Sequence, residues 1–346
     1  MSQNTPERLG FRMPAEWAPH AATWMAWPHG ETQWCGMLAP VREEFAALVA
    51  AIARVEPVDL LLHDDETAAD AERRLGNADV RRHLVPYDDV WLRDSGPVFV
   101  ARQEELALVD WTFNGWGGKY PAGLDTQIPQ RIAQRLGLRS FQPGLVLEGG
   151  SIEVNGAGLA FTTRQCLLSP RRNPDLDEKA LGAALRDYLG ITRLVWLDEG
   201  LEGDHTDGHI DMLTRFADPT TIVTSVCADR DDPNHATLAA NLDVVKRQCG
   251  RAEVPFRIVE LPVPAGRVEF GGERLPLSYA NFYIANGLVV VPAYGVPEDA
   301  GALEILRPLF PRRTVVGLPA RALISGGGAF HCVTQQQPVG AGWSAE

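Results

Sequence analysis

A repeated pattern of secondary structure constrains the fold of this chain more than any other feature of its sequence. Each copy reads as an apolar strand, a corner marked by glycine or an acidic residue, a second strand, a tight turn and a third strand, after which a helix leads to the next copy. Such spacing, with a period of about 50–70 residues, is typical of radial or stacked repeats. The five copies expected are His83–Phe113, Gly144–Thr163, Thr192–Val226, Phe256–Pro292 and Thr314–Gln337.

The two ends of the pattern predict how the array is completed. The last copy has no room for its third strand, because little chain follows Pro338. A strand at Ala22–Trp27 belongs to no complete copy, so we expect it to fill that place and close a ring. No linker-like stretch interrupts the series, so residues 1–346 are expected to form one α/β domain. Helices are expected at Val41–Val55, Asp64–Gly76, Thr126–Leu136, Leu176–Leu189, Ala236–Gln248 and Asp299–Phe310.

Polar residues occupy the corner of every copy. In a closed ring these equivalent positions would converge on the axis. Packing would favour apolar residues there, since an unpaired buried charge costs several kcal/mol. The set indicates nucleophilic catalysis on a cation. Its members are Asp94, Glu148, His209 with Asp211, Asn281 and Cys332.

The corner of the last copy carries the candidate nucleophile. Three glycines, Gly326 to Gly328, allow backbone angles and close approaches that side chains forbid. Residues 329–334 then read as a short apolar strand that presents Cys332 at the floor of a cleft. A thiolate nucleophile needs such an open approach. A free cysteine is more often a small buried apolar residue, and only the other corners make the catalytic interpretation the better one.

The third corner admits a second interpretation. His205, Asp207, His209 and Asp211 stand at alternate positions, so in a strand their side chains would face one way. They could bind a divalent metal, but no other segment shows a metal-binding spacing, and we expect no metal. Taken singly, a structural His–Asp pair, a capping role for Asp94 and a plain bend at Glu148 are the common alternatives.

Composition limits the partners and the compartment. The net charge of −13 argues against nucleic acid and anionic membranes and suits a cationic substrate. Five cysteines, an odd number with no C-x-x-C pair, disfavour a disulfide framework and a structural zinc site. The first residues do not resemble a signal peptide, and no apolar run approaches the roughly 18 residues of a membrane span. We therefore expect a cytoplasmic protein; a homo-oligomer is compatible with the sequence.

Seven segments of the chain resemble the bacterial agmatine deiminase family, which also contains a bacterial peptidylarginine deiminase branch. The resemblance runs from Phe11 to Pro338 and implies the pentein fold, a five-bladed α/β propeller with pseudo-five-fold repeats, in agreement with the five copies. The segments are FRMPAEWAPHAATWMAWP (11–28), WLRDSGP (91–97), FNGWGG (113–118), LEGGSIEVNG (147–156), TDGHID (206–211), SYANFYI (278–284) and GGGAFHCVTQQQP (326–338).

The resemblance also implies a reaction, namely hydrolysis of a guanidino group through a covalent thiouronium intermediate without metal or organic cofactor. It identifies Cys332 as the nucleophile and His209 as the general acid and base. Asp94 and Asp211 match the carboxylates that bind the guanidinium, and Glu148 matches the glutamate that supports the histidine. Two carboxylates at the edges of a planar cation leave its central carbon open to a thiolate.

Residues around these positions are expected to bind the rest of the substrate. The motifs place Trp91, Trp116 and Asn281 near the site, and His205 stands where the family usually has an acidic residue. Met212 replaces an asparagine of the family, and residues 31–35 also depart from its pattern. These departures concern the part of the substrate beyond the guanidinium.

The default reaction is the conversion of agmatine to N-carbamoylputrescine and ammonia. Alternatives are deimination of an arginyl peptide or an alkylguanidine, and amidino transfer to an amine. A catalytically inactive binding module and a metal hydrolase are less compatible with the retained motifs. The expected partner is a small cationic guanidine.

Overall fold

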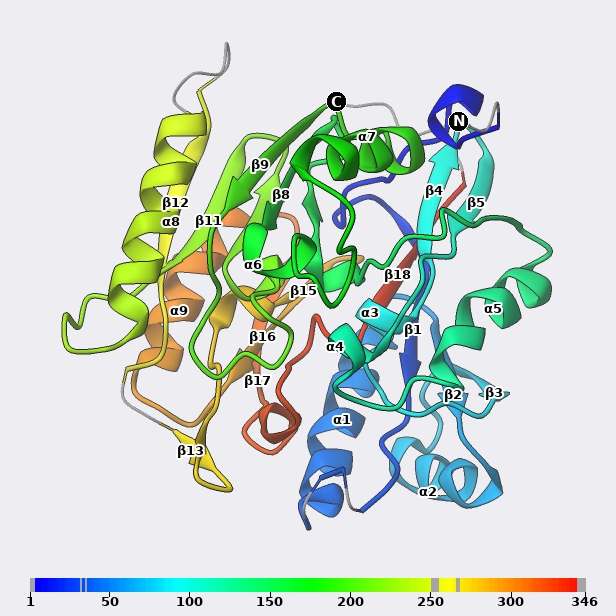
Figure 1. The fold of residues 1–346 in the computed structure, drawn as a ribbon. Helices are drawn as coiled ribbons and strands as arrows, with labels where there is room; N and C mark the ends of the chain where they lie inside the picture. Colours follow the sequence, from blue (N-terminus) through cyan, green and yellow to red (C-terminus); the bar gives the residue numbers. More distant parts are fainter. Residues whose placement is uncertain (1–3, 32, 35, 250–254, 266–267, 341–346) are drawn as a thin grey trace.

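The computed structural model describes residues 4–31, 33–34, 36–249, 255–265 and 268–340 and shows a mixed α/β fold (Figure 1). Five of its sheets are built on one pattern, in which an antiparallel pair is extended by a parallel strand after a helical crossover. In four of them the antiparallel pair comes first in the chain, whereas the fifth completes its pair with the last strand and has two parallel strands. Parallel neighbours require such a crossover, which explains why a helix recurs at the same place in each unit.

Four of the sheets have three strands each. In chain order these are β4 (Val98–Arg102), β5 (Glu105–Val109) and β6 (Arg139–Phe141); β7 (Glu153–Val154), β8 (Leu159–Thr163) and β9 (Arg193–Leu197); β10 (Thr214–Asp218), β11 (Thr221–Val226) and β12 (Arg257–Pro262); and β15 (Tyr283–Ala285), β16 (Leu288–Ala293) and β17 (Thr314–Pro319). A separate hairpin, β13 (Glu269–Phe270) and β14 (Glu273–Arg274), lies outside them. The central strand β8 is buried at every residue.

The fifth sheet joins the two ends of the chain. Its order is β18 (Gln335–Pro338), β1 (His20–Ala26), β2 (Val58–Leu62) and β3 (Val80–Leu84). Strand β1 pairs antiparallel with β18, and Trp24 lies opposite Gln335 (Figure 1). The expected strand at Ala22–Trp27 thus does complete the last copy. Among the described strands the five sheets stay separate, and none closes on itself.

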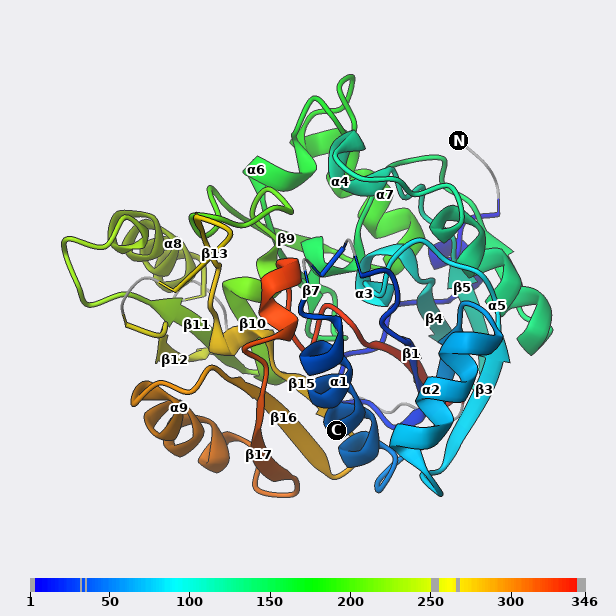
Figure 2. The ribbon, with the colours of Figure 1, turned by 90° about the horizontal axis from the view of Figure 1, so that it is seen from below.

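Helices cover the sheets at the six expected places, with ends that differ by a few residues. The view of Figure 2 places α2, α5, α8 and α9 at the periphery and the short strands β7, β10 and β15 nearer the middle. In the described part of the chain no helix is both long and apolar enough to cross a membrane. The main helices are α1 (Leu38–Ile52), α2 (Asp65–Leu75), α5 (Ile128–Leu136), α7 (Glu178–Leu189), α8 (Asn234–Cys249) and α9 (Glu298–Leu306).

The sheets do not coincide with the copies expected from the sequence, because each sheet takes strands from two neighbouring copies. The first strand of a copy, such as β9 or β17, pairs in parallel with a strand of the preceding copy, β8 or β16. A strand that follows a crossover helix returns to the sheet that the helix left, so the structural unit begins one strand later than the sequence pattern indicates. The second copy also starts too late, because β6 lies ahead of Gly144.

Two expected strands are absent. Residues 329–334 form turns, and the strand β18 begins only at Gln335. Residues 205–211 form turns that lead into a 3₁₀ helix, Ile210–Met212, so the alternate histidines and aspartates do not share a strand face. Two glycines with positive φ interrupt an extended backbone: Gly327 (φ 99°) just before the first segment and Gly208 (φ 87°) within the second.

Candidate active site

The thiol of Cys332 lies at one end of a cavity of about 640 Å³. The three-glycine segment makes this position possible, because a Cβ on Gly328 would come within 2.7 Å of the Trp91 ring and 3.0 Å of the Cys332 sulfur. A Cβ on Gly326 would meet the Trp34 and Trp91 rings at 2.6 and 2.8 Å. The glycines therefore let aromatic rings pack directly beside the thiol. Cys332 itself is 5% exposed.

The carboxylates and the amide that the sequence placed near the thiol do surround it. Asn281 Nδ2 donates to the Cys332 sulfur at 3.1 Å and to Asp211 Oδ2 at 3.2 Å. The Cys332 sulfur lies 3.5 Å from Asp211 Oδ2. Burial, with Asp211 and Asp94 close by, raises the pKa of the Cys332 thiol well above its ordinary value. In the empty site the thiol is therefore protonated at neutral pH.

Asp94 forms the other side of the pocket from the short helix α3 (Leu92–Ser95). Its Oδ2 accepts from Trp116 Nε1 at 2.9 Å, and its Oδ1 accepts from the Gly150 amide at 2.9 Å. Burial and the nearby Asp211 raise the pKa of Asp94, although His209 acts against them. Trp91 and Trp116 line the cavity wall, as expected for substrate-binding residues.

Gly150 marks the point where three corners meet. A Cβ there would lie 2.6 Å from His209 Nδ1, 2.8 Å from Asp94 Oδ1 and 3.1 Å from Asp211 Oδ2. Side chains from three stretches of chain thus crowd around one α-carbon. The glycine in the Leu147–Gly150 segment has a steric function here, since any side chain would displace the ring or a carboxylate.

His209 lies between two carboxylates and is fully buried. Its Nδ1 is 3.6 Å from Asp94 Oδ1, and its Nε2 is 3.9 Å from Glu148 Oε2. Burial alone would lower the pKa of His209, but Asp94, Cys166 and Glu148 together raise it well above the ordinary value. The neighbouring acids therefore favour the charged ring, which can give up a proton during a reaction.

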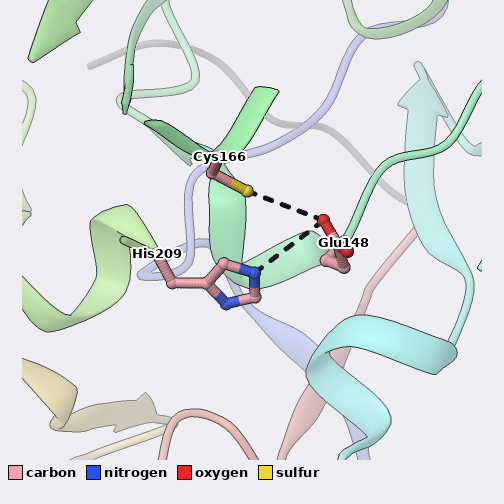
Figure 3. Close-up of side chains that lie close together, drawn as sticks. All are labelled: Glu148, Cys166 and His209. Carbon is pink, nitrogen blue, oxygen red and sulfur yellow. Dashed lines mark hydrogen bonds and ion pairs between the residues drawn. The ribbon is translucent and has the colours of Figure 1, made fainter. Parts of the chain in front are cut away.

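Glu148 is held as an anion by Arg172. Its two oxygens accept from Arg172 Nε at 2.8 and 2.9 Å, and both side chains are buried. Burial would raise the pKa of Glu148, but His209 and Arg172 lower it below its ordinary value. The Cys166 sulfur points toward the same carboxylate at 3.7 Å, and burial raises the pKa of that thiol to about 11 (Figure 3).

The geometry does not support a metal site built from the third corner. Asp207 pairs with Lys119 and Arg172, whereas Asp211 faces Cys332 and Asn281. In the described residues one group of three possible metal ligands has its atoms within 4.8 Å, namely Glu148, Cys166 and His209. Arg172 already occupies the carboxylate of that group.

Comparison with known proteins decides the family. The model of the Porphyromonas-type peptidyl-arginine deiminase family matches residues 12–338. The chain belongs to this family. It is 39% identical over 360 residues to the agmatine deiminase of Stutzerimonas stutzeri strain A1501, with 97% of each chain covered. It is 38% identical to the agmatine deiminase of Pseudomonas aeruginosa strain LESB58, again with 97% of each chain covered.

The fold agrees with this assignment. The solved agmatine deiminase of Enterococcus faecalis superposes with a TM-score of 0.91 at 32% identity, and 99% of each chain is covered. The family expected from the sequence motifs is therefore confirmed, and so is its mixed α/β fold.

The mouth of the cavity brings His205 together with a tyrosine and a glutamate. His205 lines the mouth, where its Nδ1 lies 3.0 Å from the Tyr120 hydroxyl and its Nε2 lies 3.3 Å from Glu273 Oε2. Glu273 belongs to the β13–β14 hairpin. Asp89 also lines the cavity, and burial raises its pKa to about 6. A carboxylate, that of Glu273, is therefore present beside His205.

The other departures from the family pattern have different consequences. Met212 is buried in the hydrophobic core and is not among the residues that line the cavity. Gln33 and Trp34 do line the cavity. Residues 32 and 35 lie outside the described residues.

Sequence reasoning missed several residues of this deiminase site. They act through partners far away in the chain, and no corner motif contains Arg172, Cys166 or Glu273. A buried arginine within a hydrogen bond of a buried glutamate is visible only once the fold brings residues 148 and 172 together. The residues near the site that no prediction singled out are Glu16, Asp89, Tyr120, Cys166, Arg172, Arg215, Glu273 and His331.

Proposed function

We propose that this protein hydrolyses the guanidinium group of agmatine, which yields N-carbamoylputrescine and ammonia. The observation that carries the proposal is the free oxygen of Asp211. Its Oδ1 is buried without a hydrogen-bond partner in the described structure, and it belongs to a carboxylate 3.5 Å from the Cys332 sulfur. An orphaned carboxylate oxygen is costly unless a ligand supplies donors. A guanidinium supplies five donors in one plane.

Asp94 and Asp211 would bind the cation from two sides. A guanidinium between them would form charge-assisted hydrogen bonds to both carboxylates and place its carbon next to Cys332. The bound positive charge would also offset the two carboxylates that keep the thiol protonated. Substrate binding would therefore itself favour the thiolate, because a neighbouring cation lowers the pKa of a thiol.

The reaction then needs one nucleophile and one proton carrier. Cys332 loses its proton to the solvent when the cation binds, its thiolate adds to the guanidinium carbon, and His209 gives its proton to the nitrogen that leaves as ammonia. The resulting thiouronium is attacked by water, one proton of which returns to His209. The carbon–sulfur bond then breaks, the remaining hydroxyl proton of the adduct passes to the departing sulfur, and the thiol and a ureido product are released. Glu148, fixed by Arg172, holds His209 through both steps.

We further infer the arrangement that creates the pocket. The five sheets are the blades of a five-bladed pentein propeller formed by one domain. Two observations support this: the sheets are built on one pattern, and side chains of all five corners surround one place. A cytoplasmic location and assembly into a homo-oligomer stay predictions from the sequence.

The test is a screen of ammonia release over agmatine, free arginine, an arginyl peptide and an uncharged alkylguanidine, with no amine acceptor added. The matched control is Cys332→Ala purified in the same way. We expect ammonia and N-carbamoylputrescine in equal amounts from agmatine, and none from the variant. Turnover that appears only after an amine is added would show an amidinotransferase instead. Absence of turnover with every guanidine would refute the proposal.

A further inference from the structure

The far end of the proposed substrate needs a counter-charge beyond the carboxylates that bind its guanidinium. Agmatine carries an ammonium in addition to the guanidinium, and Asp94 is already assigned to the guanidinium. Three carboxylates line the cavity in the part of the chain that the structure describes, namely Asp89, Asp94 and Glu273. The choice for the ammonium therefore lies between Asp89 and Glu273.

The two candidates differ in burial and in their partners. Glu273 has a side chain that is 74% exposed, and its Oε2 lies 3.3 Å from His205 Nε2. Asp89 is partly buried, and its Oδ1 accepts from the Val90 amide at 2.8 Å. The Trp91 side chain also donates to Asp89, whereas no cation of the described chain pairs with it. An ionised carboxylate has about four acceptor sites, so Asp89 keeps room for the donors of a ligand.

Trp91 connects Asp89 to the wall beside the thiol. A Cβ on Gly328 would lie 2.7 Å from Cζ3 of Trp91 and 3.0 Å from the Cys332 sulfur, so the six-membered ring of this indole lies close to the thiol. The donor of an indole is its Nε1, which belongs to the five-membered ring. The hydrogen bond to Asp89 therefore leaves the ring on the side opposite Cζ3. One rigid ring and one hydrogen bond separate Asp89 from the wall beside Cys332.

The tail of agmatine has a length that suits this arrangement. Three backbone bonds span about 3.8 Å, so the six bonds from the guanidinium carbon to the ammonium nitrogen reach about 7 Å when extended. An indole and a hydrogen bond of about 3 Å cover a distance of that order. With the guanidinium at Cys332 and Asp94, the four methylenes would lie along Trp91. Phe270 and Leu275 also line the cavity and offer apolar surface to them.

The loop that carries Asp89 is held in place by two other acids. The backbone amides of Asp88 and Asp89 donate to Oδ1 of the buried Asp125 at 2.7 and 3.3 Å. Asp88 Oδ2 in turn accepts from the Leu124 amide at 2.7 Å. A carboxylate on a fixed loop is preorganised for a ligand donor at one distance, so it discriminates between tails of different length.

We propose that Asp89 is the specificity-determining residue for the substrate tail, because its carboxylate accepts hydrogen bonds from an ammonium that lies one tail length from the guanidinium. The inference rests on the proposed function, since it concerns the far end of the same substrate. It assigns to the site a preference for guanidines with a terminal ammonium over guanidines with an uncharged tail. Burial raises the pKa of Asp89 to about 6, so the carboxylate is ionised at pH 8.

Steady-state kinetics at pH 8 with agmatine and its uncharged analogue pentylguanidine tests the assignment. Asp89→Asn keeps an oxygen for the Val90 amide and for Trp91 but removes the charge. It should lower kcat/KM for agmatine about tenfold to a hundredfold, through KM, and change that for pentylguanidine less than about threefold. The matched control, Glu273→Gln, should cost less than about fivefold on either substrate. Equal losses on both substrates in Asp89→Asn, or a preference lost in Glu273→Gln instead, would overturn the proposal.

A longer side chain at the same place should favour a shorter tail. Asp89→Glu moves the carboxylate about one methylene farther into the cavity. The ratio of kcat/KM for aminopropylguanidine to that for agmatine should therefore rise at least about fivefold. An unchanged ratio in a variant that still hydrolyses pentylguanidine would refute a contact between residue 89 and the ammonium.

Binding measured without turnover separates this inference from the proposed function. In calorimetry on Cys332→Ala, the additional change Asp89→Asn should weaken the binding of agmatine at least about tenfold and leave that of pentylguanidine nearly unchanged. An agmatine affinity that Asp89→Asn does not change would refute the assignment, and so would a lack of binding of both ligands. If the wild type hydrolyses no guanidine, the proposed function fails, and the two affinities still decide whether Asp89 binds the tail.

Discussion

The two ends of the cavity are built on different principles. At the inner end, Cys332, Asp94 and Asp211 are almost completely buried, and buried partners such as His331 and Arg172 support the surrounding acids. At the mouth, the side chains of His205 and Glu273 are 42% and 74% exposed and pair with each other. Buried pairs are expensive to disrupt, whereas exposed pairs contribute about 0–1 kcal/mol.

This difference indicates at which end of the cavity a substitution has the smaller effect on the reaction. A substitution at the inner end leaves an unpaired charge in a dry site, so its effect on the reaction is large. A substitution at the mouth exchanges groups that water already solvates, so it adjusts substrate preference by small steps.

The largest effect should come from the nucleophile. Cys332→Ala should lose at least about a thousandfold in activity on agmatine, because no other group can form the covalent intermediate. A chloroacetamidine, which carries the cation, should label Cys332 alone in peptide mapping. The matched control is Cys227→Ala, a half-buried thiol away from the site, which should keep full activity. Turnover that survives in Cys332→Ala would contradict the claim that substitutions at the inner end have the largest effect on the reaction.

The second largest loss of activity should come from the carboxylates at the inner end of the cavity. Asp94→Asn and Asp211→Asn keep the shape but remove a charge-assisted bond, so each should lower kcat/KM roughly tenfold to several hundredfold. Glu273→Gln at the mouth is the matched control and should cost less than about fivefold. Steady-state kinetics on agmatine measures all three. Comparable losses at the two ends would show that burial does not separate them.

The pH dependence should report the protonated thiol of the empty site. Because the pKa of Cys332 is raised above 9.0, its thiolate fraction grows with pH throughout the neutral range. We expect kcat/KM for agmatine to rise between about pH 6 and pH 9, and kcat to level off at lower pH because the bound cation favours the thiolate.

The alkylation of Cys332 provides the corresponding control. Neutral chloroacetamide should react with a rate that rises with pH up to the raised pKa of the thiol. Cationic chloroacetamidine should react faster at neutral pH, since it occupies the place of the guanidinium. Equal, pH-independent rates for the two reagents would show that the carboxylates do not control the thiol.

The smallest effect is expected at the mouth. In the wild type His205 pairs with Glu273 and offers no negative charge of its own to the ammonium of agmatine. His205→Glu should therefore raise kcat/KM for agmatine about twofold to tenfold relative to an uncharged alkylguanidine, and added salt should reduce the gain. If the wild type already prefers agmatine strongly and the variant shows no gain, Glu273 or Asp89 already binds the tail.

The sequence predicted the polar residues at the corners of the repeats better than the residues that support them. Asp94, Glu148, His209, Asn281 and Cys332 recur at one place in a repeated pattern, so the pattern alone was enough to predict that they converge. The neighbours that support them could not be predicted. Arg172 meets Glu148, and Glu16 meets His331, only because folding brings those segments together, and neither pair leaves a periodic signal in the sequence.

The errors in local structure have a similar origin. The run from Ala329 to Thr334 has the composition of a strand, but its backbone forms turns that hold Cys332 and end just before β18. Three glycines in front of it and packing against Trp91 outweigh the preference of the apolar residues for a strand. The assignment of strands to sheets failed because parallel pairing joins segments on the two sides of a helix.

The pairing of β1 with β18 bears on how the protein is made. Trp24 donates a hydrogen bond to Gln337, a residue 313 positions later, so during synthesis β1 has to wait for β18 before its sheet is complete. Catalytic competence should therefore arise only after β18 has been made, and nascent chains that stop before Cys332 should be inert. The same closure makes the molecule a candidate for circular permutation, with new ends cut at the exposed turn beside Gly287.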